Sequence, residues 1–388
     1  MGNWIKDIIL NIKTNMTEKI KKLWQKIKVF FAELGSCLYI NRRKFMKSGL
    51  ILLISLVLIL VLNLISSSIA KNVPDQTSCL KWGGKNYSQV SCYTNRAGGF
   101  STDEIMRFEY ELDKTLKTSE EERVSKWTDA YSGKGTLTIM NGNTSVEGTA
   151  YGVGNNFFFF HPLQLLNGGY IDTKNVMKDY ILLDEEAAWK LFGSNDIAGM
   201  YAYINGEPHV IAGVYKQPKN WPNKEAGNGE ITFYVSYEVL KKYNKEASIT
   251  CYEVIMENLV KHYAYNYIQN YFQPKTDEES GNINKTVKAV SVSSGEDSNR
   301  ELKIIENSDR YSMKNKWKEL KNFGVNSMKL DEIVYPFWEN IAIAYESVLT
   351  LLFFFQIIGW MITVLCVIDM IIKIYRFRKK LKIKMIDT

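Results

Sequence analysis

Two long apolar runs near opposite ends of the chain, residues 49–70 and 348–368, restrict its fold more than any other feature. Neither run contains an Asp, Glu, Lys or Arg. A helix rises about 1.5 Å per residue, so roughly 20 apolar residues cross the ~30 Å hydrocarbon layer of a bilayer. Both runs are therefore predicted to be transmembrane helices. The alternative, two buried helices of a large soluble core, fits poorly because such helices seldom stay apolar on every face.

Basic residues gather beside both apolar runs. Residues 1–48 carry eleven Lys and Arg against three acidic residues, and residues 373–388 carry seven against Asp387. Because these segments hold +8 and +6 in a chain of net charge +7, the rest carries −7. Basic flanks stay on the cytoplasmic side, which predicts a plasma-membrane protein with both termini inside and residues 71–340 outside. The charge thus indicates topology and contact with anionic lipid, and no nucleic-acid partner is expected.

A secretory signal peptide is the rival interpretation of the first run, but that run is too long and begins too late. The predicted organisation has five parts. They are a cytoplasmic segment 1–48, a first span 49–70, an extracellular domain 71–340, a second span 341–372 and a basic tail 373–388.

The first segment carries a third membrane element. Apolar residues recur every three or four positions from Trp4 to Leu34, and Lys residues occupy the other faces. This pattern predicts an amphipathic helix that lies flat on the inner leaflet. The alternatives are a helix packed on a cytoplasmic partner, or on a copy of itself as a coiled coil.

The cysteines and histidines give no indication of a metal or catalytic site. Cys79 and Cys92 close a short loop rich in Gly and polar residues, where a disulfide would contribute up to ~3 kcal/mol. Cys251 would then be an unpaired buried thiol. His161 and His209 are interpreted as satisfied core or surface histidines, since no spacing of His and Cys suits a metal. Without a nucleotide-binding or catalytic motif, the chain is predicted to be neither an enzyme nor a cofactor carrier.

The extracellular segment has the pattern of mixed α and β structure. Asn141-Gly142 and Asn205-Gly206 are hairpin dipeptides. The apolar periodicity predicts helices at 102–122, 185–192, 261–272 and 303–322, and strands at 136–140, 181–184, 201–204, 209–214, 231–235 and 251–256. Residues 274–301, rich in Asp, Glu, Ser, Gly and Asn, are predicted to be loop around an edge strand at 287–292.

The stretch 179–214 is the most specific, with the sequence DYILLDEEAAWKLFGSNDIAGMYAYINGEPHVIAGV. A strand, an acidic-start helix ending in Leu-Phe-Gly, a turn with a second Gly and a hairpin follow in this order. This order resembles the extracytoplasmic core domain of MacB-type ABC transporter permeases. Residues 152–171 are also similar to that family, with Gly169 where Arg is usual. The matching positions have structural roles and include Leu191, Phe192, Gly193, Gly199, Gly206 and Gly213.

The resemblance implies a fold class and an organisation. It implies an α+β core domain of two subdomains, carried on the two transmembrane helices that follow the amphipathic helix. The inner subdomain would cover about 145–248, and the outer flanks 71–144 and 249–330. Permeases of this type have four spans and meet their ATPase after the second, whereas this chain ends about 15 residues after its second span.

The expected function is that of a non-catalytic, two-span subunit of a MacB/FtsX-like transport or mechanotransmission complex. Its partners would be the bilayer, a separate ATPase or permease subunit or further copies of itself, and an unknown extracellular substrate or protein. Gln356, in the middle of the second span, is the candidate for helix–helix contact. The alternative function is a membrane-anchored extracellular binding or scaffold protein, while short tails disfavour a sensor with a cytoplasmic output domain.

Overall fold

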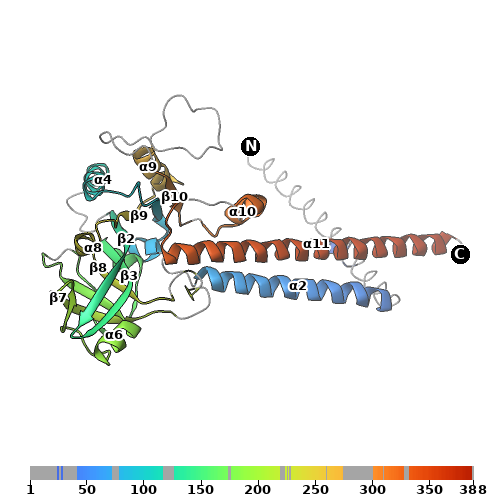
Figure 1. Ribbon diagram of the computed structural model, residues 1–388. Coiled ribbons are helices and arrows are strands. Elements are labelled where there is room, and N and C mark those ends of the chain that lie inside the picture. Colours follow the sequence, from blue (N-terminus) through green and yellow to red (C-terminus); the bar gives the residue numbers. More distant parts are fainter. Residues whose placement is uncertain are drawn as a thin grey trace, which may run out of the picture. The chain divides into compact units, whose positions relative to one another are not determined.

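The computed structural model contains two compact units (Figure 1). The first comprises Met1–Ser67 and Leu351–Thr388, and the second comprises Ser68–Thr350. The residues that the structure describes are 24, 25, 28, 42–71, 78–116, 126–173, 176–218, 223, 224, 226, 229–258, 260–273, 300–308, 310–326 and 332–386. The amphipathic helix predicted within 1–48 and the strand predicted at 287–292 lie outside these residues, apart from a few positions of the former.

Two helices of the described part are long and apolar enough to cross a membrane. The helix α2 (Arg42–Lys71) contains the first apolar stretch, Met46–Ala70, and the helix α11 (Phe337–Ile386) contains the second, Phe337–Phe377. Both correspond to the two predicted spans. The second helix is longer than its predicted span because it begins at Phe337 and continues into the basic tail.

Within the first unit, small and polar side chains join α2 to α11. The Ser55 and Thr363 hydroxyls lie 2.9 Å apart, and Ser48 Oγ donates a hydrogen bond to Asp369 Oδ2 at 2.7 Å. The residue numbers rise along one helix as they fall along the other, so the two helices are antiparallel. Gln356 is 7% exposed, as a helix–helix contact requires, but the contact itself stays a prediction.

The second unit is built on one sheet of ten strands, in the order β10-β1-β9-β2-β3-β8-β5-β7-β4. The strand β6 pairs with both β2 and β7, and only β3–β8 and β5–β7 among the pairs are parallel within the described chain. The strands are β1 (Tyr87–Thr94), β2 (Trp127–Asn141), β3 (Thr144–Asn155), β4 (Gln164–Gly168), β5 (Tyr180–Asp184), β6 (Tyr201–Ile204), β7 (Glu207–Lys216), β8 (Thr232–Ser236), β9 (Ile249–Glu257) and β10 (Leu302–Glu306).

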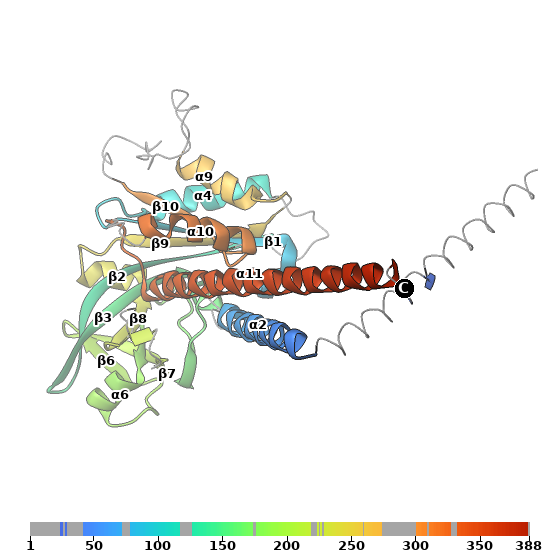
Figure 2. The same cartoon turned by 90° about the vertical axis from the view of Figure 1, so that its right-hand side faces the viewer.

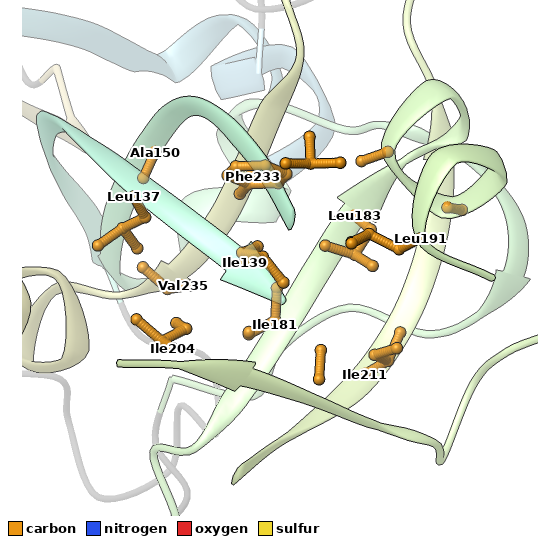
Figure 3. Packing of buried hydrophobic residues seen from close by; sticks show 14 of the residues in the cluster. Leu137, Ile139, Ala150, Ile181, Leu183, Leu191, Ile204, Ile211, Phe233 and Val235 are labelled. Atoms are coloured by element: carbon orange, nitrogen blue, oxygen red, sulfur yellow. The ribbon is translucent and has the colours of Figure 1, made fainter. Parts of the chain in front are cut away.

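Because β6 bridges β7 back to β2, six strands return on themselves and enclose an apolar cluster, called the ring core here (Figure 3). Two short helices, α6 (Glu185–Phe192) and α8 (Tyr237–Tyr243), cover it. Its buried members are Leu137, Ile139, Val146, Ala150, Ile181, Leu183, Ala187, Ala188, Leu191, Ile197, Ala202, Ile204, Ile211, Val214, Phe233, Val235, Val239, Leu240 and Ala247.

The strands β10, β1 and β9 have two differently covered faces. The helices α4 (Thr102–Thr115) and α9 (Tyr263–Phe272) pack on one of them, called the helix-covered face (Figure 2). Phe108, Val254 and Phe272 belong to one apolar cluster on this face. The opposite face carries a second cluster that includes Trp338, in the first turn of α11, and so is called the α11 face. Short helices α3 (Ser78–Trp82), η2 (Gly84–Asn86) and α5 (Phe157–Phe160) complete the unit with α10 (Met313–Asn326).

Local signals account for most element boundaries. Ser101 accepts a hydrogen bond from Glu104 N and caps α4, and Asp184 accepts one from Ala187 N and caps α6.

The prediction of one helix over 303–322 is wrong, because residues 302–306 form β10, an edge strand paired with β1, and the helix α10 begins only at Met313. The apolar spacing of this segment fits either structure, and the long-range pairing with β1 selects the strand.

Candidate functional site

The α11 face of the sheet contains a buried carboxylate. Along β9, Val254 points to the helix-covered face, so its neighbour Glu253 points to the α11 face, where it is only 1% exposed. Its Oε1 accepts a hydrogen bond of 2.7 Å from Ser91 Oγ on β1, and its Oε2 pairs with His161 Nε2. A buried carboxylate is costly without such partners, which explains the polar residues around it.

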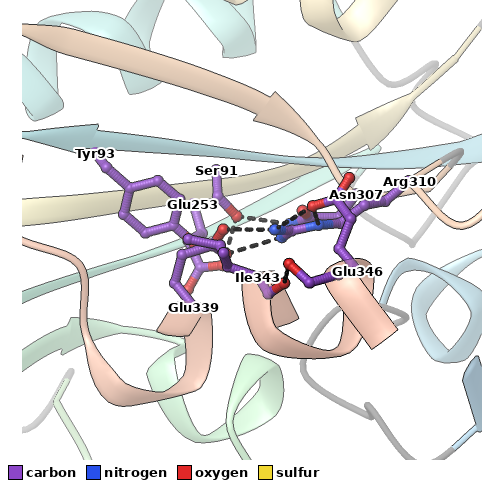
Figure 4. Close-up of polar contacts among 9 residues, drawn as sticks. Ser91, Tyr93, Glu253, Asn307, Arg310, Glu339, Ile343 and Glu346 are labelled. Atoms are coloured by element: carbon purple, nitrogen blue, oxygen red, sulfur yellow. Dashed lines mark hydrogen bonds and ion pairs between the residues drawn. The ribbon is translucent and has the colours of Figure 1, made fainter. Parts of the chain in front are cut away.

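Arg310, in the loop after β10, forms the second half of the site with two acids of α11 (Figure 4). Its Nη2 lies 2.8 Å from Glu339 Oε1, and its Nη1 donates to Glu339 Oε2 at 3.0 Å. Its Nε and Nη2 lie 3.2 and 3.1 Å from Glu346 Oε2. Burial opposes the charge of Arg310, but Glu339 and Glu346 outweigh it and raise the pKa of the guanidinium.

Two further hydrogen bonds connect the residues around Glu253 and Arg310 to strand β1. Tyr93 Oη, on β1, donates to Glu339 Oε2 at 2.9 Å, and Asn307 Nδ2 donates to Ser91 Oγ at 2.7 Å. Burial, then the charge of Glu339, raises the pKa of the Tyr93 phenol, so this group stays protonated and donates. The backbone N–H of Arg310 donates to Asn307 O at 3.2 Å and joins these two groups of contacts. The connected set is called the coupling network and consists of Ser91, Tyr93, His161, Glu253, Asn307, Arg310, Glu339 and Glu346.

An aromatic anchor lies beside the coupling network. Trp338, 1% exposed in the first turn of α11, packs against Tyr151 and Phe157 with ring centroids 5.5 Å apart in each case. The His161 ring lies 4.4 Å from the Trp338 ring, so the anchor touches the coupling network directly. Such aromatic pairs add about 0.5–1.5 kcal/mol each beyond their buried area.

The arrangement can hold the start of α11 against the sheet. Glu339 has no exposed side-chain surface and Arg310 has 3%, so their ion pair is closed to solvent. Removing one partner of a buried pair leaves an uncompensated charge and costs about 3–5 kcal/mol. Sliding α11 along the sheet would break the same pair, so a displacement of this helix start and a displacement of the strands are energetically linked.

The disulfide expected between Cys79 and Cys92 is absent, because both residues are free thiols. Cys92 belongs to the cluster on the helix-covered face with Phe108, whereas Cys79 belongs to the cluster on the α11 face, with its Sγ 3.6 Å from Ser308 Oγ. The sheet therefore separates them. Burial raises the pKa of both thiols.

The family-motif residues lie around the ring core and its turns rather than in the coupling network. Leu191 belongs to the ring core, and Phe192 packs partly buried against it. Positive φ angles occur at three of the glycines, and a Cβ at the fourth would lie 2.6 Å from Asn167 O; these are Gly193 (φ 70), Gly199 (φ 85), Gly206 (φ 85) and Gly213. Their roles are turn geometry and close packing.

The coupling network was not predicted from the sequence, although one signal for it exists. Glu339 and Glu346 are seven residues apart, which places both on one face of a helix that is otherwise mainly apolar. Two acids on such a face indicate a buried basic partner. Among the residues that the structure describes, no three His, Cys, Asp or Glu side chains gather as a metal site.

Comparisons with known proteins agree with the sequence pattern. The family model of the MacB-like periplasmic core domain matches residues 49–280. The macrolide export ATP-binding/permease protein MacB of Neisseria gonorrhoeae is 29% identical over 111 residues, which are 28% of this chain and 17% of that protein. The MacB of Neisseria meningitidis serogroup B matches equally. This chain thus matches about a sixth of the length of these relatives.

Two solved structures are similar at low identity. The periplasmic region of MacB from Actinobacillus actinomycetemcomitans has 12% identity and a TM-score of 0.36, covering 65% of this chain and 97% of that one. The extracellular domain of the Gram-positive transporter YknZ has 14% identity and a TM-score of 0.34, covering 48% and 89%. The assignment rests on the family model, which spans more than half of the sequence. The chain therefore belongs to the family of MacB/FtsX-like permeases defined by the MacB-like periplasmic core domain.

Proposed function

We propose that the chain is a non-catalytic membrane subunit of an ABC-type transport or mechanotransmission complex. In this proposal α2 and α11 cross the plasma membrane, the unit Ser68–Thr350 lies outside, and both termini lie in the cytoplasm. The boundaries of that organisation are those expected from the sequence, with an inner subdomain at about 145–248. ATP hydrolysis comes from a separate polypeptide, which binds this chain directly or through another permease subunit.

The observation that carries the proposal is the buried attachment of the start of α11. The helix begins at Phe337 with Trp338 and Glu339 buried in its first turn, inside the extracellular unit, and continues as one helix to Ile386. The coupling network holds its first turns to Tyr93 on β1 and to Arg310 after β10, and the aromatic anchor holds them to Tyr151 on β3 and Phe157 on α5. A motion applied to α11 at the membrane is then passed to the sheet, because slippage costs a buried ion pair.

Purification of the tagged full chain from native membranes tests this proposal. We expect an ATPase activity to copurify, and Arg310→Ala to keep the ATPase bound while changing the rate of hydrolysis in nanodiscs. Lys190→Ala is the matched control, because the half-exposed pair that Lys190 forms with Glu186 is not part of the coupling network. Purification without any ATPase or permease partner contradicts the proposal.

A binding or scaffold function is the second candidate, and one observation favours it. The helices α4 and α9 border an open hollow of about 590 Å³ lined by Tyr110, Tyr267 and Tyr271 with Arg107, Glu111 and Asn270. Tyrosines with polar neighbours are typical of binding surfaces. Loss of function on changing Tyr110 and Tyr267 to Ala, with no effect of Arg310→Ala, would favour this candidate over coupling.

A further inference from the structure

The helix α10 presents an unusual exposed face in an otherwise acidic extracellular segment. Met313 is 63% exposed and Trp317 is 47% exposed on successive turns. Between and beside them, Lys314, Lys318 and Lys321 are also exposed, and Lys321 Nζ lies 5.6 Å from the centre of the Trp317 ring. Residues 313–326 hold four Lys and one Glu, whereas the region between the basic termini carries a net charge of −7.

The structure also places the start of α10 near the residues of α11 that come just before the apolar run 348–368. Arg310, three residues before α10, pairs with Glu346 at 3.1 Å. Glu346 is two residues before the apolar run 348–368 begins. At its other end, α10 is joined to α11 by only ten residues, 327–336. The start of α10 thus lies near the turn of α11 that directly precedes the apolar run 348–368, and its other end is ten residues along the chain from the start of α11.

We propose that the exposed face of α10, formed by Met313, Lys314, Trp317, Lys318 and Lys321, binds the outer surface of the membrane. Tryptophan prefers the depth of the lipid headgroups, and lysines beside it extend their charged ends to phosphates while their carbon chains cover apolar surface. The positive charge selects anionic headgroups. The contact would hold the extracellular unit at a fixed height and tilt above the bilayer.

A nitroxide label on the reconstituted full chain tests this contact. Met313→Cys carries the label, Cys37 and Cys366 are changed to Ser, and the remaining cysteines are buried. Met106→Cys on α4, 57% exposed, is the matched control. In nanodiscs rich in phosphatidylglycerol we expect several-fold less access of a nickel chelate, and more access of oxygen, to the label at 313 than at 106.

Two further conditions sharpen the result. Replacing phosphatidylglycerol by phosphatidylcholine, or changing Lys314, Lys318 and Lys321 together to Gln, should return nickel access at 313 toward the value at 106. Equal nickel access at 313 and 106 in the anionic nanodiscs would overturn the proposal and leave the face open to a protein partner. Access that is low but unaffected by lipid charge and by the Lys changes would overturn the role of anionic lipid.

Discussion

The ring core and the coupling network are both buried in the extracellular unit, but opposite chemistry holds them together. The ring core consists of aliphatic, Ala and Phe side chains and is stabilised by removal of apolar area from water. The coupling network has six ionisable side chains, which come from α11 and from the strands and loops packed against it. An apolar cluster needs volume to be filled, whereas a buried ionic cluster needs every partner in place. The ring core is therefore suited to stabilising the fold, and the coupling network is suited to holding α11 in one defined position.

The largest effect is expected from removing the cation of the network. Arg310→Ala leaves Glu339 and Glu346 without their counter-charge and should lower the free energy of unfolding by about 4 kcal/mol. Urea unfolding of the full chain in detergent, followed by circular dichroism, measures it. Lys190→Ala removes a half-exposed pair and should cost about 0–1 kcal/mol. Similar losses for both variants would mean that the network is no more than a surface feature.

A truncation in the ring core should lower the free energy of unfolding slightly less than Arg310→Ala does. Unlike the coupling network, the ring core should tolerate a substitution that keeps the volume of the side chain. Leu183→Ala at a fully buried position is expected to cost about 3 kcal/mol. Leu183→Met keeps the volume and should cost less than about 1.5 kcal/mol. Arg310→Lys keeps the charge but loses the paired donors to Glu339, so its loss should exceed that of Leu183→Met. The reverse order in the same urea series would contradict the contrast between the two regions.

The stability of the protein should depend on the protonation of Asp184, which caps α6 beside the ring core. Burial, only partly offset by hydrogen bonds from Ala187 N and Thr232 N, raises the pKa of Asp184 from 3.8 to about 6. The folded state therefore binds more protons than the unfolded chain between these values, and stability should fall as pH rises from about 4 to 6, by an amount on the order of 2 kcal/mol. Asp184→Asn can still cap α6 but does not titrate. The difference in slope between the two proteins isolates this carboxyl, and identical slopes would argue against its raised pKa.

The smallest effect concerns backbone geometry alone. Gly206 closes the β6–β7 hairpin at φ 85 with open space around its Cα, so Gly206→Ala should cost about 1 kcal/mol through backbone strain. Gly169→Ala is the matched control, since Gly169 has no positive φ and a Cβ added there would meet no atom within 4 Å. Thermal unfolding should separate the two variants, and equal melting temperatures would show that the hairpin relaxes without cost.

The parts of the fold that the sequence predicts are those specified by neighbouring residues. Asp184 caps α6, Gly193 ends it in the left-handed conformation, and Asn205-Gly206 turns the next hairpin. Each signal acts within a few positions, so it can be recognised in one sequence. The two apolar helices are predictable for the same reason, since length and composition suffice.

The parts that escape prediction depend on distant partners. The strand β10 carries the sequence LKIIE, which fits a helix until its pairing with β1, some two hundred residues earlier, is known. The coupling network likewise joins Ser91, His161, Glu253 and Asn307, which come from four separate segments. The disulfide prediction failed because a short separation between two cysteines does not reveal that they lie on opposite faces of one sheet.

The central claim is that the first turns of α11 move with the sheet as one body. Spin labels at Ser347→Cys on α11 and Tyr110→Cys on α4, both exposed positions of the extracellular unit, report this by pulsed electron resonance on the full chain in nanodiscs, with Cys37 and Cys366 replaced by Ser. We expect one narrow distance distribution, broadened or split by Arg310→Ala. A distribution that is already broad with Arg310 present, or one that Arg310→Ala leaves unchanged, would contradict the claim.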